Sequence, residues 1–201
     1  RYGTTLTKEK FWAAWREEDI SDAAMYAMKN TKLNDKQLDT LFSYRPVADR
    51  KWYEQLVAGG ELMVTEQDRL LISLLQPSRL LEMVRYFVLF DKKVGKIIAR
   101  YQQVFGIKRL IERINQQRPD GGREGGVIWH TTGSGKSFTM VFLSKALILH
   151  DSLKKCRIIV VTDRIDLESQ LSKTFASGGE LASKKDREEA LATSGRGLAE
   201  K

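Results

Sequence analysis

Residues 130–137, His-Thr-Thr-Gly-Ser-Gly-Lys-Ser, decide how this chain folds, and the segments on both sides of them point the same way. Residues 127–129 form an apolar run that predicts a buried strand, and residues 138–149 keep the apolar spacing of a helix. A glycine-rich loop between a strand and a helix is the setting in which a phosphate-binding loop operates. The order of these segments therefore predicts a nucleotide site.

Each residue type in the loop suits that chemistry. Gly133 and Gly135 allow a tight turn in which backbone N–H groups point at phosphate oxygens, beside the positive end of a helix dipole. Lys136 is predicted to hold the terminal phosphates of ATP as the catalytic residue of the loop, and Ser137 to ligate Mg²⁺. His130 departs from the pattern G-x-x-x-x-G-K-[ST], which begins with glycine. The predicted ATP-binding residues of the loop are Thr131, Thr132, Gly133, Ser134, Gly135, Lys136 and Ser137.

Composition narrows the class of protein. A chain of 201 residues can hold one large domain or two small ones. Its 42% content of hydrophobic residues is enough for a core and excludes global disorder. Cys156 is the single cysteine, which excludes an internal disulfide framework, and we expect it to be a small buried hydrophobe at the start of a strand. No apolar run is long enough to span a bilayer and no signal peptide opens the chain, so we expect a cytoplasmic protein without a membrane segment. The start at Arg1 suggests a piece of a longer protein.

The net charge of +8 is concentrated in residues 85–118, where nine basic side chains stand against two acidic ones. A positive surface of this kind attracts nucleic acid or nucleotide, and the alternative is a solvated helix face. The basic residues are Arg85, Lys92, Lys93, Lys96, Arg100, Lys108, Arg109, Arg113 and Arg118.

The chain before the loop predicts a mainly helical segment over residues 1–90. Apolar residues at helical spacing indicate helices at residues 8–18, 23–28, 51–57 and 96–114, the last being the longest. Helix starts are also indicated at Asn34, at the pair Thr65 and Asp68, and at Pro77. The leucine and aromatic stripes of these helices are predicted to be packing surfaces.

The chain after the loop predicts a second strand at residues 156–162, because its continuous β-branched run is typical of a strand buried on both faces of a parallel sheet. A helix is predicted over residues 163–175. Two strands joined by a helix form a crossover unit, so the fold class is α/β, with a P-loop parallel sheet that is incomplete in this segment. We expect the sheet to belong to a domain covering residues 91–201.

Two stretches resemble one protein family, the motor subunit of type I restriction enzymes. They are residues 125–137, Gly-Gly-Val-Ile-Trp-His-Thr-Thr-Gly-Ser-Gly-Lys-Ser, and residues 159–170, Ile-Val-Val-Thr-Asp-Arg-Ile-Asp-Leu-Glu-Ser-Gln. In that family a nuclease domain precedes two RecA-like lobes that move double-stranded DNA at the expense of ATP. The resemblance implies that residues 1–90 hold the end of the nuclease domain and a connector. Residues 91–201 would then begin the first RecA-like lobe.

The resemblance also implies roles for residues outside the loop. Gln103 matches an adenine-recognising glutamine, with Gln102 as the alternative if the register shifts by one, and Thr162 and Arg164 match positions that touch the DNA backbone. The acidic Mg²⁺-binding motif, the arginine finger and the nuclease residues are expected outside this segment. We therefore expect the chain alone to bind ATP weakly and to hydrolyse it hardly at all.

The implied activity is that of an ATP-dependent DNA translocase and endonuclease subunit. Its implied cofactors are ATP and Mg²⁺, and its partners are double-stranded DNA and the methylation and specificity subunits of a restriction-modification complex. Two other classes stay open at this point: a different helicase-like DNA motor, and a P-loop kinase of small molecules.

Overall fold

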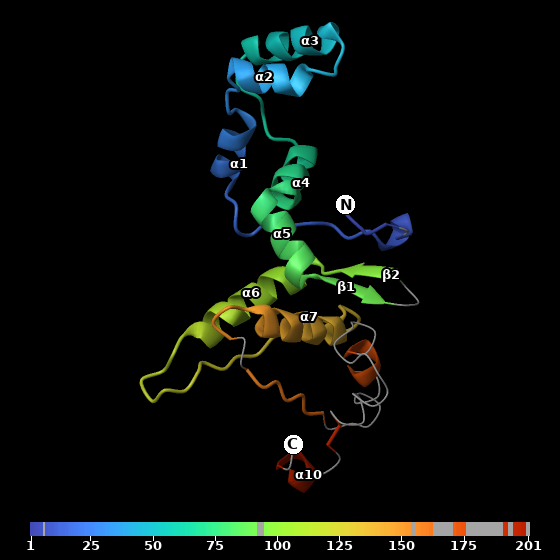
Figure 1. The fold of residues 1–201 in the computed structure, drawn as a ribbon, viewed down its shortest axis with the longest axis vertical. Coiled ribbons are helices and arrows are strands. Elements are labelled where there is room, and N and C mark those ends of the chain that lie inside the picture. The colour runs from blue at the N-terminus through green and yellow to red at the C-terminus, as the bar shows by residue number, and fades with distance from the viewer. Residues whose placement is uncertain are drawn as a thin grey trace. The chain divides into compact units, whose positions relative to one another are not determined.

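A computed structural model of the chain describes residues 1–5, 7–91, 95–153, 156–162, 171–175, 191–192 and 195–199. The chain divides into two compact units (Figure 1). One unit consists of Arg16–Leu80, and the other of Arg1–Trp15 together with Leu81–Lys201. Each unit is described by itself below.

The unit formed by Arg16–Leu80 is helical. Its helices are α1 (Asp22–Lys29), α2 (Asp35–Phe42), α3 (Val47–Ala58), α4 (Glu66–Leu75) and the first residues of α5 (Pro77–Tyr86). The predicted helix starts are confirmed. Asn34 caps α2 by accepting a hydrogen bond from the Gln37 N–H at 2.9 Å, and Thr65 and Asp68 form a capping box at the start of α4. Pro77 opens α5 as predicted.

Ion pairs between distant segments help to hold this helical unit together. Asp68 accepts a 2.5 Å hydrogen bond from Lys29 of α1. The Lys29 ammonium, together with the Thr65 hydroxyl and N–H, lowers the pKa of the Asp68 carboxyl to about 2. The Arg79 guanidinium is buried and donates to Glu17 at 3.0 Å and to Asp19 at 2.9 Å. These contacts join α5 and α4 to segments that lie far away in the sequence.

The second unit is built around a small sheet and two helices. Strands β1 (Val88–Asp91) and β2 (Gly95–Ile98) form an antiparallel hairpin, and helices α6 (Tyr101–Asn115) and α7 (Lys136–Leu149) lie side by side (Figure 1). The buried core draws on α5, the hairpin and both helices. It comprises Met83, Phe87, Leu89, Ala99, Val104, Ile107, Val141, Phe142 and Ala146.

The helix predicted at residues 8–18 is wrong. Only a 3₁₀ turn, η1 (Glu9–Phe11), is helical there. Tyr2 and Ala13 instead exchange two backbone hydrogen bonds of 2.9 Å, and the Tyr2 hydroxyl donates to the Ala99 carbonyl at 2.6 Å. Trp15 packs edge-on against Tyr2 and in a tilted arrangement against Phe105 of α6. The pairing of Tyr2 with Ala13 and the hydrogen bond to Ala99 take the place of the local helical pattern.

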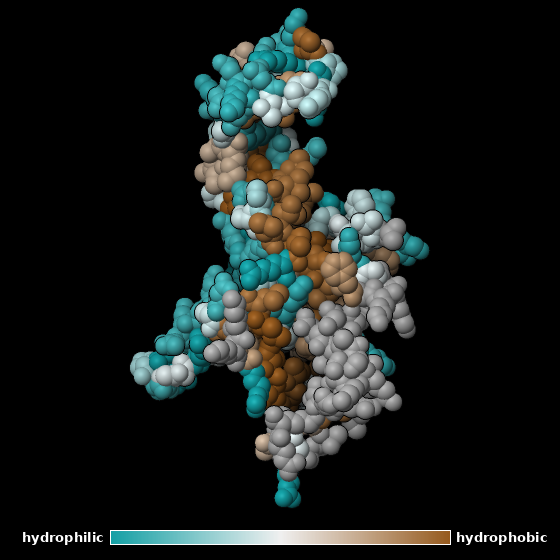
Figure 2. Space-filling view, viewed as in Figure 1, coloured by the Kyte–Doolittle hydropathy of each residue, from teal (hydrophilic) through white to brown (hydrophobic). Residues whose placement is uncertain are grey.

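The helix predicted at residues 96–114 begins too early, because residues 95–98 form β2. Gly95 adopts φ 87°, which allows the hairpin to turn, and Lys96–Ile98 then pair with β1 in the register Phe90 to Lys96 and Val88 to Ile98. The apolar stripe predicted for α5 is also exposed at Leu80, Leu81 and Val84, as are Leu71 and Leu75 of α4 (Figure 2).

The two predicted parallel strands form no ladder within the described residues. Residues 127–129 and 156–162 are extended chain without sheet partners there, and Val127 and Val161 are 90% and 83% exposed. A parallel strand exists only through hydrogen bonds to its neighbours, so a β-branched run alone does not make one. Cys156, predicted to be buried, is exposed for the same reason. Residues 171–175 are helical, and the rest of the helix predicted at 163–175 lies outside the described residues.

The remaining described helix is the short α10 (Gly195–Ala199). Across the described ranges, none of the helices combines the length and the apolarity that a membrane span needs.

Buried Tyr2 predicts a loss of stability in alkali. Burial raises the pKa of its phenol well above the ordinary value, although the Arg100 charge and a hydrogen bond with the Tyr101 backbone act in the opposite direction. Above about pH 10 the unfolded chain loses the Tyr2 proton while the folded chain keeps it, so stability falls as pH rises. At pH 8 we expect the free energy of unfolding of wild type to exceed that of Tyr2→Phe by about 1 kcal/mol, because the variant lacks the hydrogen bond to the Ala99 carbonyl.

Urea unfolding of both proteins from pH 8 to 11 measures this effect. The advantage of wild type should shrink above pH 10. A constant difference across that range would contradict the assignment.

Candidate nucleotide-binding site

The loop at residues 130–137 has the backbone shape that its glycines predict. Gly133 and Gly135 both adopt the left-handed conformation, with φ 77° and φ 87°, and Gly135 is the N-cap of α7. The first hydrogen bond of the helix runs from the Thr139 N–H to the Gly135 carbonyl at 3.0 Å. The N–H groups that precede it have no acceptor inside the helix and point out of its positive end. Such a turn attracts an anion.

Gln103 of α6 holds this turn in place. Its side chain is only 4% exposed, and its Nε2 donates to the Gly135 carbonyl and to the Thr139 hydroxyl, both at 3.1 Å. Its Oε1 accepts from the Arg100 N–H at 2.8 Å and so completes the start of α6. The structure thus gives Gln103 a supporting role toward the loop. Gln102, the alternative adenine contact, is exposed.

The close approach of Gln103 and the left-handed backbone both disfavour a side chain at position 135. A Cβ at Gly135 would stand 3.2 Å from the Gln103 Nε2, on a backbone that L-residues rarely adopt. We expect Gly135→Ala to lower the free energy of unfolding by about 1–2 kcal/mol and to weaken ATP binding, because the turn must rearrange. Gly125→Ala is the matched control, since a Cβ there has nothing within 4 Å. Equal effects of the two substitutions in denaturant titrations would refute this explanation.

Three side chains of the loop are available to a ligand in different ways. Lys136 is exposed, and its ammonium makes no hydrogen bond or ion pair with the described residues. The Ser134 hydroxyl is buried and has no partner in the same part of the chain. Ser137 is half-buried in the first turn of α7. The Lys136 ammonium, the Ser134 hydroxyl and the N–H groups at the start of α7 can all bind phosphate oxygens of a nucleotide. The Ser137 hydroxyl is of the type that ligates Mg²⁺ beside them.

Two cavities adjoin the loop, and both are lined by Arg100, Gln103, Gly133 and Ser134. The first, about 550 Å³, lies between the N-terminal segment, β2 and the start of α7. The second, about 460 Å³, has mostly polar walls that include Gln102 and the loop itself. Its further lining residues are Trp129, His130, Thr131 and Thr132. The loop therefore stands between two hollows of a size suited to small ligands.

His130, the departure from the glycine pattern, packs against α6. Its Nε2 lies 4.0 Å from the place where a Cβ would stand at Gly106, which is an ordinary van der Waals distance.

Much of the predicted basic surface is neutralised within the protein. Lys108 pairs with Glu82 at 3.6 Å, and Arg113 with Glu124 at 3.2 Å. Arg118 pairs with Asp120 at 2.7 Å. Arg100 lines both cavities instead, so part of this charge lies beside the candidate site.

The predicted DNA contacts are described only in part. Thr162 is half-buried and lines neither cavity, whereas Arg164 lies outside the described residues.

Sequence reasoning missed the residues that complete the first cavity. Phe11 and Tyr2 come from a segment that was predicted to be a helix, and their proximity to the loop depends on pairing across the unit. Arg100 carried a usable signal, because glutamine at the third position of a helix accepts from the N–H of the capping residue. The signal was obscured because arginine is not a typical N-cap.

A family model for the SWI2/SNF2 ATPase matches residues 102–200. This range contains the loop and most of α6. It is independent support for the use of nucleotide by this part of the chain.

Curated relatives are endonuclease subunits of type I restriction enzymes. The type I restriction enzyme HindI endonuclease subunit of Haemophilus influenzae is 46% identical over 121 residues, which are 58% of this chain and 12% of the relative. The putative MjaVIIP endonuclease subunit of Methanocaldococcus jannaschii is 39% identical over 109 residues, 51% of this chain and 10% of the relative. The SauCOLORF180P endonuclease subunit of Staphylococcus aureus is 36% identical over 104 residues, with the same two shares.

The chain thus spans between a tenth and an eighth of the length of these relatives. Over that segment, the resemblance predicted from the sequence is confirmed. No solved structure is significantly similar to the chain.

Proposed function

We propose that this chain, a relative of type I restriction enzyme endonuclease subunits, is part of the subunit that moves along double-stranded DNA with ATP and cleaves it. Its identity of 46% to the HindI subunit and the SWI2/SNF2 ATPase match support this proposal. The observation that carries it is the loop, where a left-handed Gly135 and the exposed Lys136 ammonium meet at the start of α7.

ATP with Mg²⁺ is the ligand that the loop residues fit. The backbone N–H groups at the start of α7 would receive phosphate oxygens, and the Ser134 hydroxyl would gain the partner that it lacks. Lys136 would place its ammonium on the terminal phosphates, and Ser137 would supply an oxygen to Mg²⁺. When bound, Mg²⁺ would neutralise charge that develops on the transferred phosphoryl group.

The protein residues contribute position and charge to this step. Gln103 keeps the turn closed through the Gly135 carbonyl, so the N–H groups stay aimed at the ligand. The Lys136 ammonium would stabilise the negative charge on the terminal phosphates.

We further propose the larger architecture. Residues 1–90 are taken as the end of a nuclease domain with its connector, and residues 91–201 as the start of a RecA-like lobe whose parallel sheet uses residues 127–129 and 156–162. The exposed apolar side chains of these segments, such as Val127 and Val161, are what unpaired central strands would present. Thr162 and Arg164 are proposed to contact the DNA backbone. Methylation and specificity subunits are the proposed protein partners, in the cytoplasm.

Displacement of a third strand from a DNA duplex tests the proposal. The protein that contains this chain is assembled with methylation and specificity subunits on DNA that carries a recognition site and a distant triplex. We expect ATP-dependent release of the third strand, delayed in proportion to its distance from the site. ATP consumption that ignores DNA would favour a P-loop kinase. Movement that needs neither partner subunit would favour a different helicase-like motor.

A further inference from the structure

We propose that the 550 Å³ cavity beside the loop binds the base and ribose of the nucleotide, and that Phe11 is the face on which the base stacks. The inference rests on the proposed function, because it assumes that the phosphates lie on the loop. The loop residues Gly133, Ser134 and Gly135 also line this cavity. A nucleotide whose phosphates lie on the loop can therefore place its base and ribose in the cavity.

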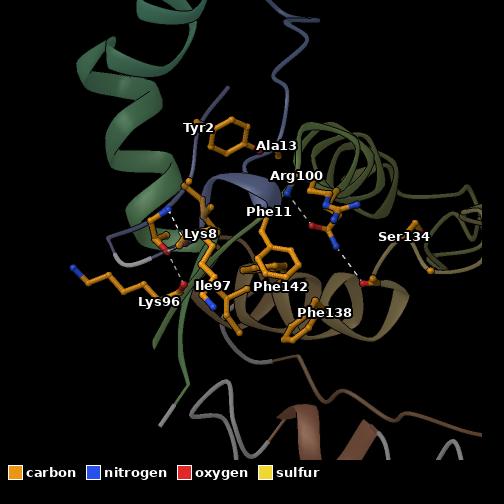
Figure 3. Close-up of a pocket in the computed structure, with 17 residues that line it drawn as sticks. Tyr2, Lys8, Phe11, Ala13, Lys96, Ile97, Arg100, Ser134, Phe138 and Phe142 are labelled. Carbon is orange, nitrogen blue, oxygen red and sulfur yellow. Dashed lines mark hydrogen bonds between the residues drawn. The ribbon is translucent and has the colours of Figure 1, made fainter. Parts of the chain in front are cut away.

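The walls of the cavity suit a flat, apolar ring. Phe11 approaches from η1, Phe138 and Phe142 from α7, and Ile97 from β2 (Figure 3). The Phe11 ring faces Phe138 and Phe142, whereas the Lys96 side chain extends away from them. Aromatic rings bind other flat rings by stacking, which a polar wall does not do. The second cavity offers mainly polar groups, and its one aromatic residue, Trp129, is 89% exposed.

Phe11 is held in this position by the N-terminal segment. Thr4 donates its hydroxyl to the Lys96 carbonyl of β2 at 2.7 Å, and the Trp12 Nε1 donates to the Thr7 carbonyl at 2.9 Å. With the bonds of Tyr2 to Ala13 and Ala99, these contacts anchor both sides of η1. The Phe11 ring is 63% exposed, and the turn that carries it is fixed without a ligand. Little conformational entropy is therefore lost in ordering Phe11 when a base binds.

The same geometry predicts how selective the cavity is. The Gln103 amide already donates to Gly135 and Thr139 and accepts from the Arg100 N–H, so it is not available to read the edge of a base without breaking those bonds. Stacking recognises the face that all bases share. Arg100 is exposed and lines both cavities. We therefore expect ATP and GTP to bind with similar affinity.

Binding of ATP, GTP and inorganic tripolyphosphate to the 201-residue chain, each with Mg²⁺, tests the inference. Phe11→Ala should weaken both nucleotides about tenfold and leave tripolyphosphate unchanged, because base stacking is worth about 1–3 kcal/mol. Phe11→Trp should retain nucleotide affinity. Phe90→Ala is the matched control: Phe90 is 64% exposed on β1 and lines neither cavity.

The outcomes separate this inference from the proposed function. Unchanged nucleotide affinity in Phe11→Ala, or an equal loss for tripolyphosphate, overturns the stacking role. Failure of wild type to bind any of the three ligands refutes the proposed function instead.

Photolabelling with 8-azido-ATP gives a readout that needs no variant. A label on the peptide that contains Phe11 supports the inference. A label confined to the peptide that contains Trp129 places the base in the second cavity and overturns it.

Discussion

Lys136→Ala is expected to weaken ATP binding about 10- to 100-fold, because a charge-assisted hydrogen bond is worth about 1.5–3 kcal/mol. In the full-length subunit, hydrolysis should fall about 10²–10³-fold, as expected when an electrostatic contact to developing charge is lost. Thermal stability should hardly change, because Lys136 is exposed and makes no ion pair with the described residues. Calorimetric titration with ATP and a DNA-stimulated phosphate-release assay measure the two effects.

The same helix provides the control. Lys145 is the other lysine of α7, and its ammonium donates to the Val88 carbonyl of β1 at 2.8 Å. Lys145→Ala should therefore lower the free energy of unfolding by about 1 kcal/mol and leave ATP affinity unchanged. If Lys136→Ala destabilised the fold as much as Lys145→Ala, its effect on binding would say nothing about phosphate contact.

Gln103→Ala is expected to destabilise the protein by about 2–3 kcal/mol, because it removes three hydrogen bonds of a buried side chain and leaves the Arg100 N–H without its partner. The loop also loses the hydrogen bond from Gln103 that holds the Gly135 carbonyl, so we expect weaker binding of both ATP and tripolyphosphate. Urea unfolding and calorimetric titration of the same preparation would measure the two losses together.

Gln102→Ala distinguishes support of the loop from recognition of adenine. Gln102 is exposed, so its replacement should change stability by no more than about 0.5 kcal/mol. Gln102 lines the second cavity but not the first, in which the base is proposed to bind, so we expect Gln102→Ala to leave the affinities for ATP and for tripolyphosphate unchanged. A selective loss of ATP affinity would instead make Gln102 the adenine contact. If Gln103→Ala reduced only ATP binding and left both stability and tripolyphosphate binding intact, the role of Gln103 as a brace would be wrong.

Features that depend on a few neighbouring residues were predictable from the sequence. The caps at Asn34 and Thr65, the start of α5 at Pro77 and the tight turn at Gly133 and Gly135 were all predicted. Each of them follows from a hydrogen bond or a backbone angle within about four residues, which the local sequence specifies. The resemblance to type I restriction enzymes also belongs here, because it is carried by two short stretches.

The predictions of strand positions were wrong because a strand depends on residues that lie far away in the sequence. Residues 158–161 have a strong β pattern but no ladder partner in the described part of the chain, whereas Lys96 and Ile97, predicted as helix, pair with β1. A strand forms only where a partner is present, and that partner is set by the fold as a whole.

The sequence by itself determined the loop, its lysine and the resemblance to type I restriction enzymes, because these reside in consecutive residues. Only the tertiary structure decided what surrounds the loop. The bond from Gln103 to Gly135 spans 32 residues and that from Tyr2 to Ala99 spans 97, and together they bring Phe11 beside the loop. Contacts over such separations depend on how the apolar core closes around Val104 and Phe142, which no local pattern specifies.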